Sequence, residues 1–90
     1  MALFPLSCNF EGDFVVQLLP VDTENTMDEV AAAAAYHTVG RRVADRPGHL
    51  LRVRRQGAED CFARTLKVAE AGLQPTECVE VIWQAPAHGA

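Results

Sequence analysis

The sequence predicts an α+β fold, a mixed sheet of about five strands covered by one main helix and a short helical turn. Residues 2–10 and 78–83 alternate apolar and polar side chains as half-buried strands do. Between them, an alanine-rich segment beginning at Met27 has the spacing of an amphipathic helix. Because 90 residues allow only one hydrophobic core, we expect a single domain over residues 1–84 and a flexible tail over residues 85–90.

The first two predicted strands form a hairpin. The apolar side of the first strand carries Ala2, Phe4, Leu6, Cys8 and Phe10. Gly12 lies in the turn that follows, where a positive φ is easily adopted. Residues 14–21 form the second strand, and Pro20 has no N–H to donate to a ladder, so this strand should lie at a sheet edge or end there.

The helix has clear start and stop signals. Thr26 and Glu29 match the capping box that satisfies two unpaired backbone N–H groups. Gly40 lies near the predicted C-terminus, where helices often stop. The side chains that we expect to pack on the strands are Met27, Val30, Ala31, Ala34 and Thr38.

The C-terminal half supplies the remaining elements. Residues 49–55 predict a third strand, with Leu51 and Val53 on one side and Arg52 and Arg54 on the other. A short fourth strand over residues 61–64 and a helical turn over residues 66–71 follow, and then comes the last strand over residues 78–83. This order resembles the ubiquitin-like β-grasp, in which the last strand pairs parallel to the first.

The outward side of the helix lacks charge. Between Glu29 and Arg41 the sequence has no charged side chain. We interpret this outward side as a partner interface, since alanine permits close approach and tyrosine is enriched in contacts. Its candidate residues are Ala32, Ala33, Tyr36, His37 and Val39. The alternative is that alanine is simply the best helix former.

The basic residues are segregated along the chain. The net charge is −4, yet all eight Lys and Arg residues lie between Arg41 and Lys67. We expect Arg41, Arg42, Arg52 and Arg54 to meet acidic groups of a partner. Solvated arginines or a nucleic-acid site are alternatives, although the acidic total and the isolated Phe62 argue against nucleic acid.

No catalytic, cofactor-binding or metal-binding residues are expected in this chain. Its three cysteines and three histidines lack metal-ligand spacing, and its six glycines are scattered. The N-terminus lacks the basic region of a signal peptide, and no stretch is long and apolar enough to span a membrane. We therefore expect a cytoplasmic protein that binds no membrane.

Several motifs together resemble one family. The helix start VD…MD-x-V-A, the helix end V-G-R-R-V, and the later R-V-R-R and A-G-L-x-P-T-E are similar to the gamma subunit of toluene-monooxygenase-type hydroxylases, called system protein B. The resemblance extends to about Trp83. It implies a β-grasp subunit that packs on an alpha chain and binds no iron itself.

The same resemblance implies the rest of the assembly. Such hydroxylases are dimers of alpha, beta and gamma chains, and the alpha chain holds a di-iron centre that hydroxylates arenes or epoxidises alkenes. Electrons come from NADH through a reductase and a Rieske ferredoxin, and an effector protein tunes the site. The alternatives to a gamma subunit are a free-standing β-grasp adaptor, a small-molecule-binding module and, more remotely, a nucleic-acid-binding protein.

Overall fold

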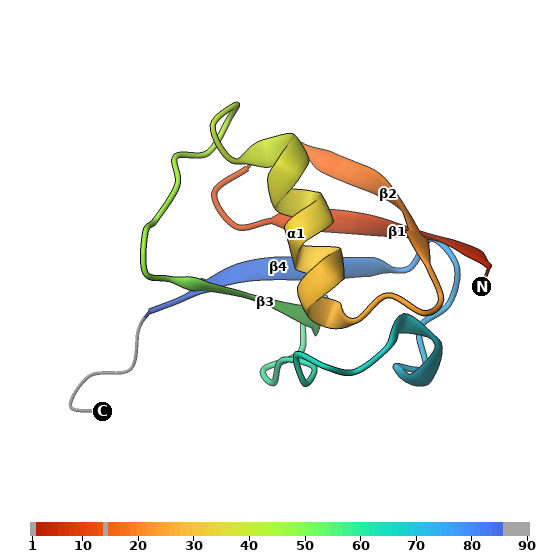
Figure 1. Cartoon of the computed structure of the whole chain (residues 1–90). Helices are drawn as coiled ribbons and strands as arrows, with labels where there is room; N and C mark the ends of the chain where they lie inside the picture. The colour runs from red at the N-terminus through yellow and green to blue at the C-terminus, as the bar shows by residue number, and fades with distance from the viewer. Residues whose placement is uncertain (1, 14, 86–90) are drawn as a thin grey trace.

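The computed structural model describes residues 2–13 and 15–85, and it contains a four-stranded sheet with one α-helix (Figure 1). The elements in chain order are β1 (Leu3–Phe10), β2 (Val16–Asp22), α1 (Met27–Thr38), β3 (Leu50–Arg55), the 3₁₀ turn η1 (Val68–Glu70) and β4 (Cys78–Gln84). Beyond Ala85, the tail predicted over residues 85–90 lies outside the described residues.

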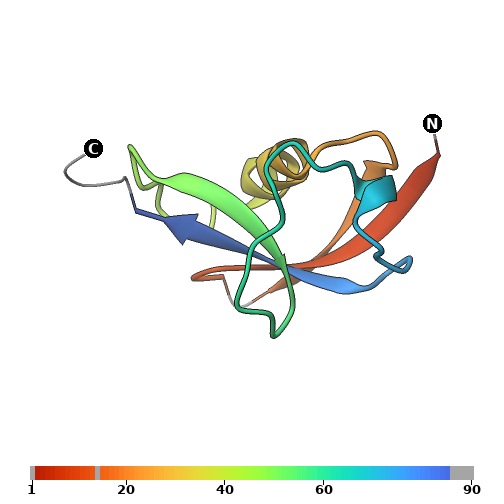
Figure 2. The same cartoon turned by 90° about the horizontal axis from the view of Figure 1, so that it is seen from below.

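The sheet is mixed, with strand order β2-β1-β4-β3. The two central strands, β1 and β4, run parallel, as predicted for the first and last strands, and the two outer pairs are antiparallel. Pro20 of β2 lies opposite Pro5 of β1, and β2 is an edge strand. The prediction that the strand with Pro20 lies at a sheet edge is therefore confirmed. Figure 2 shows α1 against one face of the twisted sheet, while none of the described helices lies on the opposite face.

The core lies between that covered face and α1. Every helix residue predicted to face the strands is buried, as are alternate residues of β1 and the inward valines of β3 and β4. Phe10 meets Trp83 edge-on, with ring centroids 5.7 Å apart. The buried residues are Leu6, Cys8, Phe10, Leu19, Val21, Met27, Val30, Ala31, Ala34, Thr38, Val53, Val68, Leu73, Val79 and Val81.

The predicted helix caps are present. The Thr26 hydroxyl accepts a hydrogen bond from the backbone N–H of Glu29 at 3.3 Å, and the Glu29 carboxylate accepts one from the N–H of Thr26 at 2.9 Å. Both bonds serve groups that lack a partner inside the helix. The helix ends at Thr38, and Gly40 has a φ of 80°, a conformation that glycine adopts without steric cost.

The predicted strand over residues 61–64 is wrong, and the sheet has four strands rather than five. One ladder-like bond forms, from the N–H of Phe62 to the carbonyl of Val53 at 2.8 Å. The chain then leaves the sheet, and the carbonyl of Arg64 accepts the N–H of Asp28 at 3.1 Å. This segment therefore supplies a carbonyl acceptor to the first turn of α1, whose N–H groups have no partners within the helix.

Candidate partner interface

The outward side of α1 divides into two flanks that face different strands. At its crest Ala32 and Tyr36 are exposed, and the Tyr36 side chain is 73% exposed. Tyr36 meets His37 edge-on, with ring centroids 5.2 Å apart. Ala33 and Val39, which we also predicted to face a partner, are half-buried.

One flank forms a shallow groove with β3. The groove has a volume of about 390 Å³, and its wall includes Ala32 and Ala35 of α1 and Val39 directly after the helix. Leu50 and Trp83 lie across from them. Because each alanine ends at Cβ, the helix leaves space here that a longer side chain would fill.

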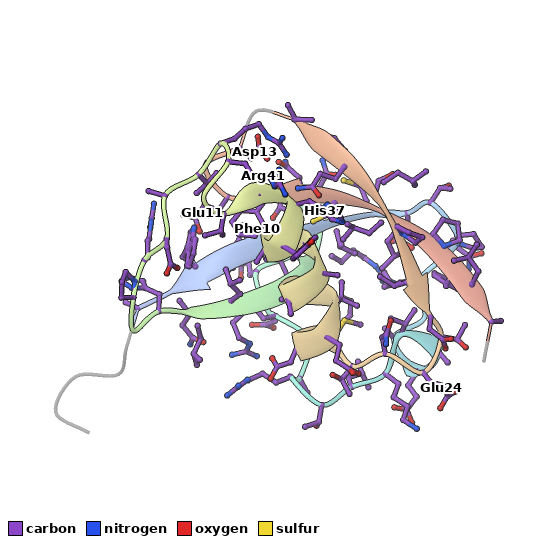
Figure 3. The ribbon with its side chains drawn as sticks, turned by 45° about the horizontal axis from the view of Figure 1, so that its top comes forward. Phe10, Glu11, Asp13, Glu24, His37 and Arg41 are labelled. Atoms are coloured by element: carbon purple, nitrogen blue, oxygen red, sulfur yellow. The ribbon has the colours of Figure 1, made fainter. Side chains whose placement is uncertain are left out.

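The other flank faces β2. A hollow of about 500 Å³ lies between the strand edge and the end of the helix. Figure 3 shows His37 and Arg41 near this end of α1. The hollow is lined by Gln17, Leu18, Tyr36, His37, Arg41 and Arg42.

Polar contacts hold the C-terminal end of α1 to the N-terminal hairpin. The Gln17 amide donates to the hydroxyl of buried Thr38. Arg42 Nε donates to both carboxylate oxygens of Asp13 at 2.9 Å. Burial opposes ionisation of Asp13, but bonds from Arg42, from the N–H of Val15 and from Thr38 outweigh it, so the pKa of this carboxyl lies below its ordinary value.

The two predicted sheet arginines lie on the face of the sheet opposite α1. Val53 points into the core, so Arg52 and Arg54 point away from the helix. Arg54 Nε lies 2.6 Å from a carboxylate oxygen of Glu80 on β4. Arg52 donates to the side chain of Gln84 and to the carbonyl of Phe62. The nine predicted interface residues therefore do not form one continuous surface.

Most of the basic residues have acidic partners within the chain. Five ion pairs form among the described residues, namely Arg42–Asp13, Arg54–Glu80, Arg55–Glu77, Arg64–Asp28 and Lys67–Glu24. Arg41 makes no ion pair with any of the described residues. Since these pairs are internal, the basic segment offers a partner fewer free charges than its sequence indicates.

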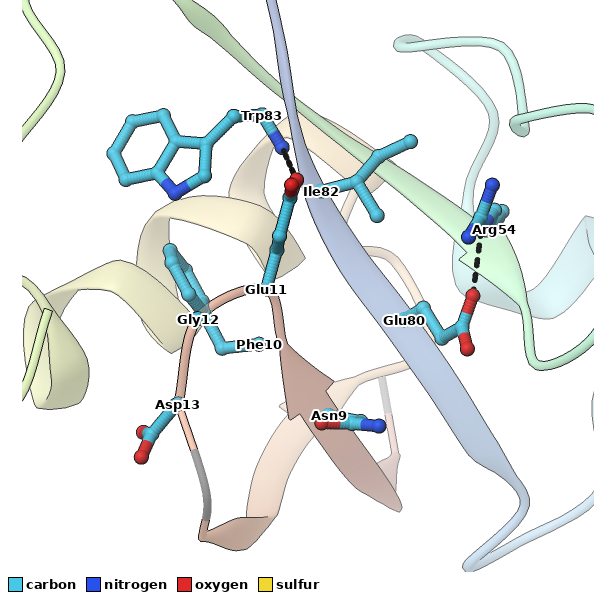
Figure 4. A pocket seen from close by; sticks show the side chains of 9 residues that line it. All are labelled: Asn9, Phe10, Glu11, Gly12, Asp13, Arg54, Glu80, Ile82 and Trp83. Carbon is cyan, nitrogen blue, oxygen red and sulfur yellow. Dashed lines mark hydrogen bonds and ion pairs between the residues drawn. The ribbon is translucent and has the colours of Figure 1, made fainter.

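A third hollow, of about 460 Å³, lies where β1 and β4 run side by side (Figure 4). The Glu11 carboxylate accepts the backbone N–H of Trp83 at 2.7 Å. The backbone N–H of Glu11 donates to the carbonyl of Val81 at 2.8 Å, which continues the strand pairing past the end of β1. The other charged groups of the lining, Arg54, Glu80 and Asp13, are in ion pairs. Each charged group that the described residues contribute to this hollow is therefore engaged by another group of the chain.

Burial disfavours the thiolate form at two of the three cysteines. Burial, followed by the charges of Cys78 and Asp13, raises the pKa of the Cys8 thiol to about 12, and burial also raises the pKa of Cys78. Within residues 2–13 and 15–85, no three His, Cys, Asp or Glu side chains are placed to hold a metal ion. None of the helices in the same ranges has the length and apolar character needed to cross a bilayer.

Sequence reasoning missed an exposed apolar strip on β2. Val16 is 59% exposed and Leu18 is 64% exposed, on the side of the strand that points away from the core. The signal was present, because residues 14–21 are apolar at nearly every position rather than at alternate ones. A strand of this kind in a sheet with one covered face must expose apolar side chains.

Comparisons with known proteins point to one family. The model of the family described as "Toluene-4-monooxygenase system protein B" matches residues 3–83. The chain is 46% identical over 84 residues to the gamma subunit of the hydroxylase component of the toluene-4-monooxygenase system of Ectopseudomonas mendocina, covering 93% of this chain and 99% of that protein.

A second relative and a solved structure agree with this match. The chain is 51% identical over 47 residues to the oxygenase gamma subunit of the alkene monooxygenase system of Xanthobacter autotrophicus (strain ATCC BAA-1158 / Py2), covering 52% of this chain and 53% of that protein. It also resembles a chain of a toluene 4-monooxygenase HD complex with the inhibitor 4-bromobenzoate. The TM-score is 0.89 at 46% identity, covering 92% of this chain and all of that one.

Proposed function

The chain belongs to the family of toluene-4-monooxygenase system protein B, and from this membership we propose that it is the small non-catalytic gamma subunit of a toluene or alkene monooxygenase hydroxylase. The match along nearly the whole gamma subunit of the Ectopseudomonas mendocina hydroxylase carries the proposal. The arginine and the acids that line the hollow between β1 and β4 are held in ion pairs within the chain, which supports a structural rather than a chemical role for them. Its fold, with parallel central strands under one helix, supports assignment to the ubiquitin-like β-grasp.

The assembly that this function implies contains alpha and beta subunits in an (alpha beta gamma)₂ arrangement in the cytoplasm. The di-iron centre lies in the alpha subunit, and the effector protein, Rieske ferredoxin and reductase act on the complete complex. The hydrocarbon is oxidised in the alpha subunit, so the gamma subunit affects the reaction only by stabilising the structure of the alpha subunit.

We propose that the gamma subunit stabilises alpha helices that carry iron ligands. Ligands must be held to a fraction of an ångström, and packed outer elements supply that rigidity. The outward side of α1 is suited to such packing. Ala32 and Ala33 let another helix approach closely, and Tyr36 supplies an exposed aromatic side chain.

The test is to express the alpha and beta subunits with and without this chain. With a tagged chain present, the three subunits should co-purify with iron. When the reductase, the Rieske ferredoxin and the effector protein are added, this complex should show NADH- and O₂-dependent oxidation of toluene or an alkene. Without it, the alpha–beta complex should contain less iron and turn over more slowly. Failure of the tagged chain to co-purify would refute the subunit assignment, whereas full iron loading and normal turnover without it would refute the supporting role.

A further inference from the structure

We propose that the alpha–beta complex of the hydroxylase docks on the edge of β2, on a surface formed by Val16, Leu18, Tyr36, His37 and Arg41, which we call the β2-edge surface. The hydroxylase surface that meets it presents apolar side chains to Leu18 and Tyr36 and a carboxylate to Arg41. This inference rests on the proposed function and names the contact surface that the function requires.

The first reason is exposure of apolar side chains at an edge strand. Val16, Leu18 and Tyr36 are each more than half exposed. Edge strands usually carry charge on their exposed side, because an uncharged apolar edge promotes association with other chains. β2 has no Lys or Arg, and its only acid is the terminal Asp22. Pro20 cannot donate to an added strand and protects one position of this edge, whereas Val16 and Leu18 expose apolar side chains with no charged residue beside them on the strand.

The second reason is that the strand and the helix contribute to one hollow. Leu18 from β2 and Tyr36 and His37 from α1 line the same depression. Val16 lies two residues before Leu18 on the same side of the strand. The apolar strip on β2 and the outward side of α1 are thus parts of one surface that extends around the strand edge. This surface includes part of the helix surface proposed above as the contact with the alpha subunit.

The third reason is charge, which identifies the partner's chemistry. Arg41 and Arg42 both line the hollow, and the residues lining it include no Asp or Glu. Asp13 neutralises Arg42 at 2.9 Å, while Arg41 has no ion pair within the described ranges. A positive site at the margin of an apolar surface, in a protein of net charge −4, fits a partner with a carboxylate beside apolar groups.

The groove beside β3 is the rival surface, and its features are less suited to docking. Its lining holds the Asp28–Arg64 ion pair, with 2.9 Å between the charged atoms. The lining also includes the acid Asp45, which has no ion pair among the described residues, so the groove offers no unpaired arginine or lysine to a carboxylate. Leu50 is its most exposed large apolar residue and is 41% exposed, against 64% for Leu18. Arg54, on the open sheet face, is similarly engaged by Glu80.

The test is co-purification of tagged variants with the alpha and beta subunits. Leu18→Glu and Arg41→Glu should each reduce recovery of the hydroxylase by about tenfold or more, and added salt should weaken the wild-type complex. Leu50→Glu, a leucine-to-glutamate change at the opposite edge strand, is the matched control and should assemble normally. Tyr36→Asp repeats the test on the helix, in case Leu18→Glu does not fold, and circular dichroism verifies the fold of each variant.

The outcomes separate this inference from the proposed function. If the wild-type chain does not bind the hydroxylase, the proposed function fails. If it binds, and folded Leu18→Glu, Arg41→Glu and Tyr36→Asp variants bind equally well, only the β2-edge surface is refuted. Loss of binding in Leu50→Glu alone would place the contact at the β3 groove. A wild-type homodimer that Leu18→Glu dissociates, with hydroxylase binding unchanged, would assign the surface to a second copy of this chain and overturn the inference.

Discussion

Arg42 and Asp13 form a bifurcated contact in which Arg42 Nε donates to both carboxylate oxygens at 2.9 Å. The contact joins the loop after α1 to the turn after β1, across 29 residues of chain. The sequence predicts that Arg42 meets an acidic group of a partner protein, whereas the acid that pairs with it lies within the domain. The pair also leaves Arg41 as the neighbouring cation without an ion pair among the described residues.

Asp13→Asn should destabilise the domain at neutral pH and have little effect in strong acid. The folded-state pKa of Asp13 is lowered, so its stabilisation is present above the ordinary value of 3.8 and is lost as pH falls through the folded pKa. The free energy of unfolding in urea, measured across this range, should therefore differ between wild type and variant at neutral pH and converge at the acid end. The control is Asp45→Asn, at an exposed acid without an ion pair in the described ranges. A difference for Asp13→Asn that does not depend on pH would contradict this account.

Cys8 should be the least reactive of the three cysteines in the folded protein. Its side chain is fully buried, and its pKa of about 12 leaves almost no thiolate near neutral pH. Cys61 is half-buried and should react first with a thiol reagent. Mass spectrometry of partially labelled native protein gives the order, and labelling in denaturing urea is the control, in which the three sites should react at similar rates. Early labelling of Cys8 in the native protein would show that this part of the core opens.

Charge reversal at Arg54 should affect the stability of the fold, whereas charge reversal at Arg41 should affect assembly. Arg54→Glu places two acids together on β3 and β4 and should lower the free energy of unfolding, because it removes the contact with Glu80 and adds repulsion. The coupling energy between Arg54 and Glu80 in a double-mutant cycle should be about 0.2–1 kcal/mol. Arg41→Glu should leave unfolding nearly unchanged and weaken hydroxylase binding. The reverse pattern, with Arg54→Glu affecting binding alone, would place the contact on the open sheet face.

The sequence predicted most of the fold because the strands and the helix are encoded locally. Alternation marked β1 and β4, and the Thr26–Glu29 capping box marked the start of α1. Prediction failed at residues 61–64, because the backbone there bonds to the start of α1, a contact distant in sequence. The helical turn was also overextended: the helical part covers only Val68–Glu70.

The candidate site was less predictable than the fold, since it depends on which faces meet in space. The uncharged outward side of α1 was visible in the sequence, and Tyr36 is exposed as expected. The arginines were not predictable in this way, because a basic side chain looks the same in sequence whether its acid is on β4, as for Arg54, or on a partner. The exposure of Leu18 required the strand order, which places β2 at an edge.

Glutamate substitutions at two adjacent alanines of α1 test which flank of the helix contacts the alpha–beta complex. Ala33 lies on the flank toward β2, one turn before His37, while Ala32 lines the groove beside β3. Glutamate has a helix propensity close to that of alanine, so Ala33→Glu and Ala32→Glu should cost similar and small amounts of helix stability. We expect Ala33→Glu to raise the dissociation constant for the hydroxylase by about tenfold or more, because it places a carboxylate at the apolar contact. Ala32→Glu should raise the dissociation constant less. Titration of each tagged variant against purified alpha–beta complex measures both dissociation constants. A larger loss of affinity from Ala32→Glu would mean that the helix docks through the β3 groove.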